Sequence, residues 1–170
     1  MAETYTLYKL IVLYMLERVD FPLTTSQISD FILDKGYTSY FKLQEILSEL
    51  TESDLLKVET THNRTLYHLT ENGEETIHFF SNKISPAIRQ EIDDFLKEKR
   101  YDLKEEVSVK SDYYLNTNHE FEVRCQIVEN GYSLIDLKLT VPTEKEAETI
   151  AAKWSLKSQE IYTSLLTDLL

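Results

Sequence analysis

The fold is decided by the stretch from Phe21 to Leu50, which reads FPLTTSQISDFILDKGYTSYFKLQEILSEL. Thr24 and Gln27 have the spacing of a capping box, which predicts that a helix begins there, and Gly36 suits the position just past its end. A second apolar stripe at helical spacing consists of Leu43, Ile46, Leu47 and Leu50. Two short amphipathic helices joined by a tight turn predict a helix-turn-helix.

Two runs of alternating apolar and polar residues follow, at 56–61 and 65–70. His62, Asn63 and Arg64 form a polar tip between them, so the sequence predicts a two-stranded hairpin. A helix-turn-helix followed by such a hairpin is a winged helix. Duplex DNA is usually contacted by the second motif helix and by the wing. In this chain these elements are expected at about 39–52 and about 56–70.

Four short runs of the sequence also carry a resemblance to a known family. They are KLIVLY at 9–14, PLT at 22–24, YTSYFKLQ at 37–44 and YHLTENG at 67–73. They resemble a domain-of-unknown-function family from Gram-positive Firmicutes, whose members are described as candidate winged-helix transcriptional regulators. More loosely, the leucine-threonine pair with a glycine three residues later is similar to MarR-like and PadR-like repressors. The resemblance implies a DNA-binding regulator and names no operator, effector or target.

Further helices are predicted on both sides of the winged-helix motif. The first covers about 4–18 and is apolar over much of its circumference, so it is either buried within the domain on two sides or contributes to a dimer. Thr70 caps a helix that ends near Lys83, and Pro86 occupies the favoured first position of another. A change of period places a domain boundary near 100–105.

Beyond this boundary the sequence predicts a three-stranded antiparallel meander covered by one helix. The pattern alternates from Val107 onward, and Asn130-Gly131 is the dipeptide preferred in a two-residue type I′ turn. Thr143 and Glu146 form a second capping box, which opens a helix to about Thr167. The fold class is therefore α+β. The expected domains are a winged helix at 1–84, a connecting helix at 85–104 and a meander-plus-helix domain at 105–170.

The charge of the chain counts against nucleic-acid binding. The 170 residues carry a net charge of −12, and residues 1–80 contain six basic against thirteen acidic side chains. Polyanionic DNA is normally met by Lys and Arg. DNA binding therefore requires a local positive strip that joins Lys42 and Arg64, with Lys35 or Lys57 as extensions and the acidic side chains turned elsewhere.

The candidate DNA contacts come from the second motif helix, the wing and the start of the first motif helix. Lys42 suits phosphates and Gln44 suits base edges. Phe41 either contacts a thymine methyl group or a protein partner, or packs in the turn because the helix begins later. Arg64 either enters a minor groove or lies in a solvated loop. Thr25, at the start of the first motif helix, either binds a phosphate with its neighbours Thr24 and Ser26 or belongs to a helix start whose only role is capping. The full candidate set is Thr25, Ser39, Tyr40, Phe41, Lys42, Gln44, Ser48, His62, Asn63 and Arg64.

The last helix is longer than a three-stranded sheet needs. Strands of five to six residues span roughly 20 Å, whereas a helix of about 25 residues spans roughly 38 Å. The surplus carries an apolar end, which predicts a homodimer contact if it is exposed; alternatively, it folds back on the first or fifth helix. The candidate dimer contacts are Ile161, Leu165, Leu166 and Leu169.

Residues that catalysis or ligand binding would require do not form a recognisable set. No zinc signature, phosphate-binding glycine loop or nucleophile elbow occurs, so we expect no enzyme, metal or cofactor, and no small-molecule effector is identified. Cys125 alternates with buried positions, which indicates a core thiol. Without a membrane-spanning run or signal pattern, we expect a cytoplasmic protein. Two function classes remain: a DNA-binding transcriptional regulator, and a winged-helix interaction module whose acidic surface meets a basic protein partner.

Overall fold

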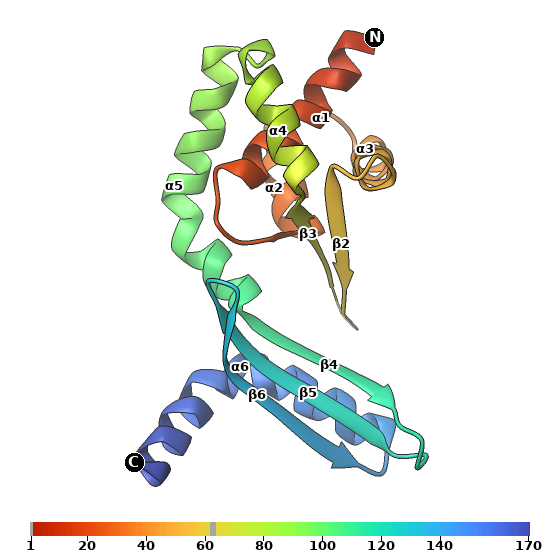
Figure 1. The fold of residues 1–170 in the computed structure, drawn as a ribbon, viewed down its shortest axis with the longest axis vertical. Coiled ribbons are helices and arrows are strands. Elements are labelled where there is room, and N and C mark those ends of the chain that lie inside the picture. The colour runs from red at the N-terminus through yellow and green to blue at the C-terminus, as the bar shows by residue number, and fades with distance from the viewer. Residues whose placement is uncertain (1, 62–63) are drawn as a thin grey trace. The chain divides into compact units, whose positions relative to one another are not determined.

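The computed structural model describes residues 2–61 and 64–170, which form two compact units (Figure 1). Of the described residues, the first unit comprises 2–60 and 64–107, and the second comprises 61 and 108–170. The predicted α+β class is confirmed, because helices and a small sheet are followed by a three-stranded antiparallel sheet and a long C-terminal helix. No helix within the described ranges combines the length and the apolarity needed to span a bilayer.

The first unit contains the helix-turn-helix and the hairpin that the sequence predicts. The motif helices are α2 (Thr25–Asp34) and α3 (Tyr40–Glu52). Between them Gly36 has a φ of +69°, a left-handed conformation that favours glycine. The hairpin strands are β2 (Leu56–Thr60) and β3 (Thr65–Leu69). The unit also contains α1 (Ala2–Glu17), α4 (Glu71–Phe80), the 3₁₀ turn η1 (Ser81–Lys83) and α5 (Pro86–Ser108).

A short strand ahead of α2 extends the hairpin to three strands. β1 (Leu23–Thr24) pairs antiparallel with β3, so the strand order is β1-β3-β2. A helix, a short strand, two helices and a hairpin that pairs with that strand make a winged helix, which confirms this part of the predicted fold. The tip residues His62 and Asn63 lie outside the described residues.

The capping box of α2 is present and also links this helix to α5. The hydroxyl of Thr24 accepts a hydrogen bond from the Gln27 backbone N–H (3.0 Å), and the Gln27 side-chain carbonyl accepts one from the Thr24 N–H (2.9 Å). The amide nitrogen of Gln27 then donates to the Leu103 carbonyl (3.2 Å) and to the Glu106 carboxylate (2.9 Å). One buried glutamine therefore both starts α2 and fixes it against α5.

The part of α1 from Leu10 to Leu16 is buried around its whole circumference within the first unit. Every residue from Leu10 to Leu16 is buried, and all seven belong to one apolar cluster with residues of α2, α3, α4 and α5. The first of the two alternatives for this helix is therefore correct, and its apolar residues are used by the core of the unit.

α5 ends later than the sequence pattern indicates. The helix continues to Ser108, whereas a connecting helix was expected to stop near 104 and a strand to start at Val107. Leu103 and Val107 are both buried and lie one helical turn apart, so they continue the apolar stripe of α5. Val107 fits an alternating pattern as well as a helical one, and this ambiguity explains the difference.

The second unit is a meander of strand order β4-β5-β6. Its elements are β4 (Val109–Leu115), β5 (Phe121–Glu129), β6 (Tyr132–Val141) and α6 (Glu144–Leu169). Asn130 and Gly131 both have positive φ, at 51° and 81°, as the predicted type I′ turn requires. α6 begins at the predicted capping box, where the Thr143 hydroxyl accepts a hydrogen bond from the Glu146 N–H.

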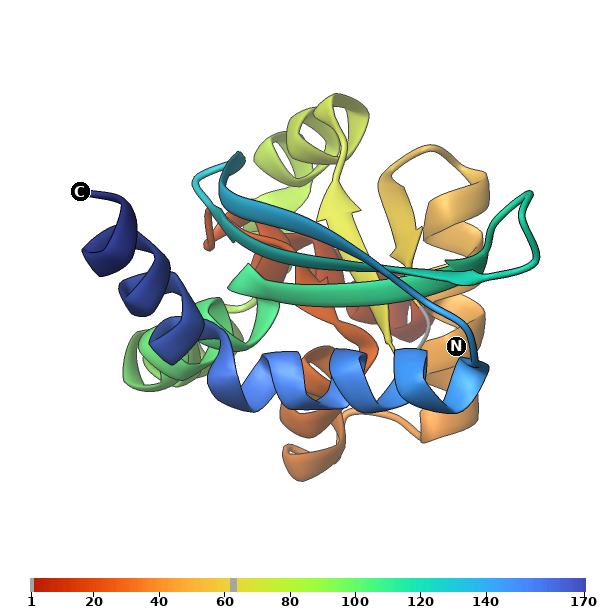
Figure 2. The same cartoon turned by 90° about the horizontal axis from the view of Figure 1, so that it is seen from below.

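α6 lies along one face of the second sheet (Figure 2). The indole N–H of Trp154 donates to the Gln126 carbonyl of β5 at 3.1 Å. Cys125 is buried in this core, as predicted, and burial raises its pKa to about 11, so the thiol stays protonated near neutral pH. The buried residues of this core are Tyr113, Val123, Cys125, Ile127, Ala147, Ala151 and Trp154.

Candidate nucleic-acid interface

α3 packs one apolar stripe against the core of the first unit and leaves its other side largely exposed to solvent. The buried residues are Leu43, Ile46, Leu47 and Leu50. Ser39 caps the helix, because its hydroxyl accepts a hydrogen bond from the Lys42 N–H at 3.3 Å. Six predicted DNA contacts therefore lie on α3 or its cap: Ser39, Tyr40, Phe41, Lys42 and Ser48 are exposed, and Gln44 is half-buried.

Two adjacent aromatic rings mark the exposed start of α3. Phe41 is 84% exposed and Tyr40 is 51% exposed, and their ring centroids lie 6.1 Å apart in an edge-to-face arrangement. Because α3 begins at Tyr40, the alternative in which Phe41 packs inside the preceding turn is wrong. Both rings are available to a partner and contribute little to the core of the unit.

The lysines near α3 are paired with acidic side chains. The Lys42 ammonium lies 3.3 Å from the Glu45 carboxylate, one turn along the same helix, and Lys9 of α1 lies 2.6 Å from Glu49. Both ammonium groups also lie over the ring of Tyr5, at 5.2 Å and 4.8 Å from its centroid. This face is therefore close to neutral. Exposed pairs of this kind contribute at most about 1 kcal/mol, so a phosphate can compete for Lys42.

Arg64, at the base of the wing, is directed toward α5. Its guanidinium donates a hydrogen bond to the backbone carbonyl of Glu106, and burial lowers its pKa. The strip that Lys42 and Arg64 were expected to form is therefore interrupted in this structure, because Arg64 would have to exchange its bond to Glu106 before it could contact DNA. Thr25, the remaining described candidate, is half-buried at the start of α2.

An acidic groove lies between α2 and α5, and the sequence analysis did not identify it. It has a cavity volume of about 720 Å³, and its acidic lining residues are Asp30, Asp34, Glu91, Asp94, Glu98, Asp102 and Glu106. Among the lining residues that the structure describes, only Lys35 and Lys99 contribute positive charge. Lys35, considered above as an extension of the positive strip, therefore belongs to an acidic surface.

The acidic side chains that α5 contributes to the groove could have been identified from the sequence. Glu91, Asp94, Glu98 and Asp102 recur at three- and four-residue intervals, so they share one side of a helix. Acidic stripes of this type are common on solvated helices. What the pattern could not supply is the facing stripe on α2, because the packing of α2 against α5 depends on Gln27 and Leu103.

The four predicted dimer contacts lie on the last three turns of α6, where the helix extends past the sheet (Figures 1 and 2). Leu169 is 79% exposed and Leu166 is 42% exposed. Ile161 is also exposed, whereas Leu165 is half-buried. Among the described residues, the apolar end of α6 is therefore covered only partly by the core of the second unit.

Comparison with known proteins identifies a family and no close relative of known activity. A family model described as a domain of unknown function, DUF4364, matches residues 8–169. No curated protein and no solved structure matches the chain. Since the match covers both compact units, the winged helix and the meander with its helix are parts of one family architecture. The chain belongs to the DUF4364 family of unknown function.

Proposed function

We propose that the protein is a DNA-binding transcriptional regulator that reads duplex DNA through α3 and the wing. The observation that carries this proposal is the winged-helix topology, in which α3 bears exposed Tyr40, Phe41, Lys42 and Ser48. A major groove admits such a helix, where Phe41 would contact a thymine methyl group and Gln44 a base edge. Lys42 would exchange Glu45 for a phosphate.

The acidity of the chain is compatible with this proposal only if much of it faces away from DNA. Seven acidic side chains line the groove between α2 and α5, on helices other than α3. On α3 itself, Glu45 and Glu49 are each paired with a lysine. We therefore expect weak non-specific binding and a small salt dependence, because few phosphates are neutralised.

The test is selection of bound fragments from a genomic DNA library, followed by titration of the selected site. Phe41→Ala should weaken binding to that site by roughly 1–3 kcal/mol if the ring contacts a base. Phe79→Ala is the matched control, because Phe79 is 77% exposed on α4 and its truncation should leave binding unchanged.

Two further variants test the polar contacts of α3. Gln44→Ala should reduce discrimination among DNA sequences, and Lys42→Ala should lower the salt dependence of binding by about one phosphate contact. Equal binding by wild type, Phe41→Ala and Gln44→Ala would contradict this docking mode.

A second candidate function is recognition of a basic protein partner, and the acidic groove is the observation that favours it. The groove side chains Asp94 and Glu98 are exposed on consecutive turns of α5. A lysine- and arginine-rich segment would neutralise them, and such an interaction weakens with salt. Polyanionic DNA would be repelled by this surface.

A lysine- and arginine-rich peptide tests this candidate directly. Binding should fall in Asp94→Lys and Glu98→Lys and persist in Asp168→Lys, a matched charge reversal on α6. Phe41→Ala should leave peptide binding intact, so the two functions are separable in one set of variants. Loss of peptide binding in the Asp168→Lys control as well would mean that the peptide responds only to net charge.

A further inference from the structure

One edge strand of the second sheet, β6, has an apolar face that α6 covers only partly. α6 packs mainly against β4 and β5 and has few contacts with β6. On the face of β6 that α6 shares, Ile135 and Leu137 are only half-buried and Leu139 is 46% exposed. Within the described residues β6 pairs with β5 alone, so its other edge presents backbone donors and acceptors to solvent.

A bulge limits the part of β6 that can pair regularly. Ile135 is opposite Ile127, but Ser133 is opposite Val128, so Leu134 is an extra residue on β6. Beyond it the strand runs regularly through the sequence Ile135-Asp136-Leu137-Lys138-Leu139. In this five-residue block an acidic and a basic side chain flank the central leucine, and an apolar residue stands at each end.

This block is complementary to itself in the antiparallel direction. If Leu137 lies opposite Leu137 of a second copy, Asp136 lies opposite Lys138 of that copy and Ile135 lies opposite its Leu139. The relation is reciprocal, as a two-fold interface requires. A shift by two residues in either direction would instead place Asp136 opposite Asp136 or Lys138 opposite Lys138, and like charges directly opposite destabilise a strand pair.

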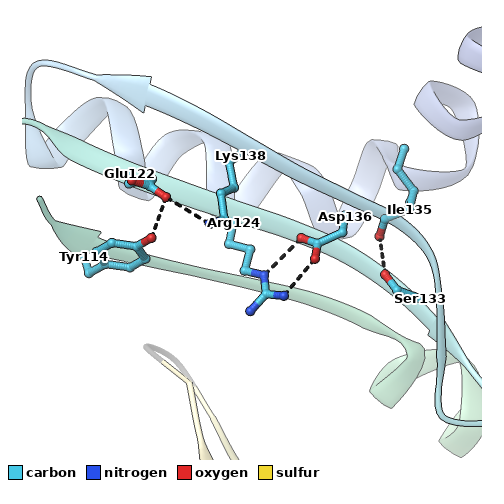
Figure 3. Close-up of polar contacts among 7 residues, drawn as sticks. All are labelled: Tyr114, Glu122, Arg124, Ser133, Ile135, Asp136 and Lys138. Atoms are coloured by element: carbon cyan, nitrogen blue, oxygen red, sulfur yellow. Dashed lines mark hydrogen bonds and ion pairs between the residues drawn. The ribbon is translucent and has the colours of Figure 1, made fainter.

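The neighbouring side chains on the polar face extend this complementarity (Figure 3). Arg124 of β5 donates to both carboxylate oxygens of Asp136, at 3.0 and 2.7 Å. The Lys138 ammonium lies 3.5 Å from the Glu122 carboxylate. Because the Lys138 side chain is 59% exposed, its ammonium can also contact a carboxylate of a strand added beside β6. In the register of the sheet Arg124 is opposite Lys138, so the contacts of Arg124 with Asp136 and of Lys138 with Glu122 are diagonal. Pairing two β6 strands would extend these diagonal contacts into a chain of alternating charge from Glu122 through Lys138 to Asp136 and Arg124 of the second copy.

We propose that the protein forms a homodimer in which β6 pairs antiparallel with β6 of a second copy, with Leu137 opposite Leu137. The two meanders then form one six-stranded sheet, and Leu139 is covered by Ile135 of the second copy. Strand addition at an exposed edge supplies main-chain hydrogen bonds, and the side chains of the block set the register. This inference goes beyond the proposed DNA or protein binding and does not depend on it.

The experiment measures the mass of the full chain in solution over a range of concentrations. We expect wild type to dimerise, and Leu139→Lys to stay monomeric wherever wild type is dimeric. Leu115→Lys is the matched control, because Leu115 is 56% exposed on β4, the opposite edge strand of the same sheet, and should leave the dimer intact. Trp154 fluorescence verifies that each variant keeps its second core.

Two charge reversals test the register. Asp136→Lys and Lys138→Asp should each weaken self-association roughly tenfold, because each creates two like-charge pairs across the edge. Mixed together, the two variants should form a heterodimer about as stable as the wild-type dimer, since every charge again faces its opposite. The exposed ion pairs that these changes remove within the sheet are weak, so folding should be kept.

Three outcomes would overturn the proposal. The first is a wild-type protein that is monomeric at all concentrations. The second is a Leu139→Lys variant that dimerises as tightly as wild type, whereas Leu166→Lys does not, which would locate the dimer contact on the end of α6. The third is mixed charge variants that associate no better than either variant alone.

Discussion

The two compact units differ in how completely they bury their apolar helices. In the first unit, the whole segment from Leu10 to Leu16 of α1 is buried, because α3, α4 and β3 all pack against that helix. In the second unit, α6 covers one sheet face, and Leu156 and Leu169 remain 83% and 79% exposed. The apolar residues at the centre of α1 are thus core, whereas several on α6 are surface, so α6 and the sheet that it covers are a better place to expect self-association than α1.

The largest predicted difference is between a leucine truncation in α1 and one in α6. Leu13→Ala should lower the free energy of unfolding of the first unit by about 2–5 kcal/mol, because Leu13 is 1% exposed and truncation leaves a cavity. Leu156→Ala should change stability by less than about 0.5 kcal/mol. Denaturant titration followed by far-ultraviolet circular dichroism gives both values.

The same titration tests whether the cores are separate. Trp154 is the single tryptophan and lies in the core of the second unit, so its fluorescence reports that unit. Its transition should be nearly unchanged in Leu13→Ala. An equal shift of both signals would show that the two units unfold as one cooperative structure.

Much of this fold was predictable because its signals are local. The capping pairs at Thr24 and Thr143, and the left-handed residues Gly36, Asn130 and Gly131, act on their own turns of backbone. Such signals do not depend on the rest of the chain. They therefore located the helix-turn-helix, the second hairpin turn and the start of α6.

The candidate site was predicted less completely because its features are long-range. The bond from Arg64 to Glu106 joins residues 42 positions apart, and nothing near Arg64 in the sequence indicates it. The groove likewise requires α2 to lie against α5 through Gln27. Sequence pattern placed Phe41, Lys42 and Gln44 away from the buried face of α3, as the structure has them. It could not assign Lys42 to Glu45 and the ring of Tyr5.

The next largest effect concerns Gly73 of the first unit, which has no room for a side chain. A Cβ atom at Gly73, near the start of α4, would lie 2.2 Å from the backbone carbonyl oxygen of Leu55. Gly73→Ala should therefore destabilise the first unit by about 1–3 kcal/mol, because a backbone atom cannot move aside as a side chain can. Thermal denaturation measures the change. The neighbouring Asn72→Ala variant, which removes one exposed hydrogen bond to Asp54, should have a smaller effect.

The same capping device occurs in both units, which allows a matched comparison of burial. Thr24→Ala should cost about 1–2 kcal/mol, near the upper end for a cap, because Thr24 is 4% exposed and water cannot replace its hydrogen bond. Thr143→Ala should cost about 0.5–1 kcal/mol, since Thr143 is exposed. Denaturant titration followed by far-ultraviolet circular dichroism and by Trp154 fluorescence compares the two losses of stability. A larger loss from Thr143→Ala would mean that burial does not set the strength of these caps.

The smallest effect is the pH dependence of the ion pair beside α3. Lys9 holds the pKa of Glu49 below its ordinary value of 4.5, chiefly through their hydrogen bond. A carboxylate with a lowered pKa in the folded state stabilises that state above its ordinary pKa and loses this contribution as the pH falls through the lowered value. The stability of the first unit should therefore decrease on acidification below 4.5.

Glu49→Gln should remove part of this decrease, because the amide does not titrate. Glu45→Gln, a matched loss of charge on the same helix, controls for the change in net charge. Hydrogen exchange of the α1 backbone amides measures the first unit at each pH, while Trp154 fluorescence follows the second unit and should not distinguish Glu49→Gln from wild type. An unchanged pH profile in Glu49→Gln would show that the pair with Lys9 contributes nothing measurable. In that case Lys9 is as available to a phosphate as an unpaired lysine would be.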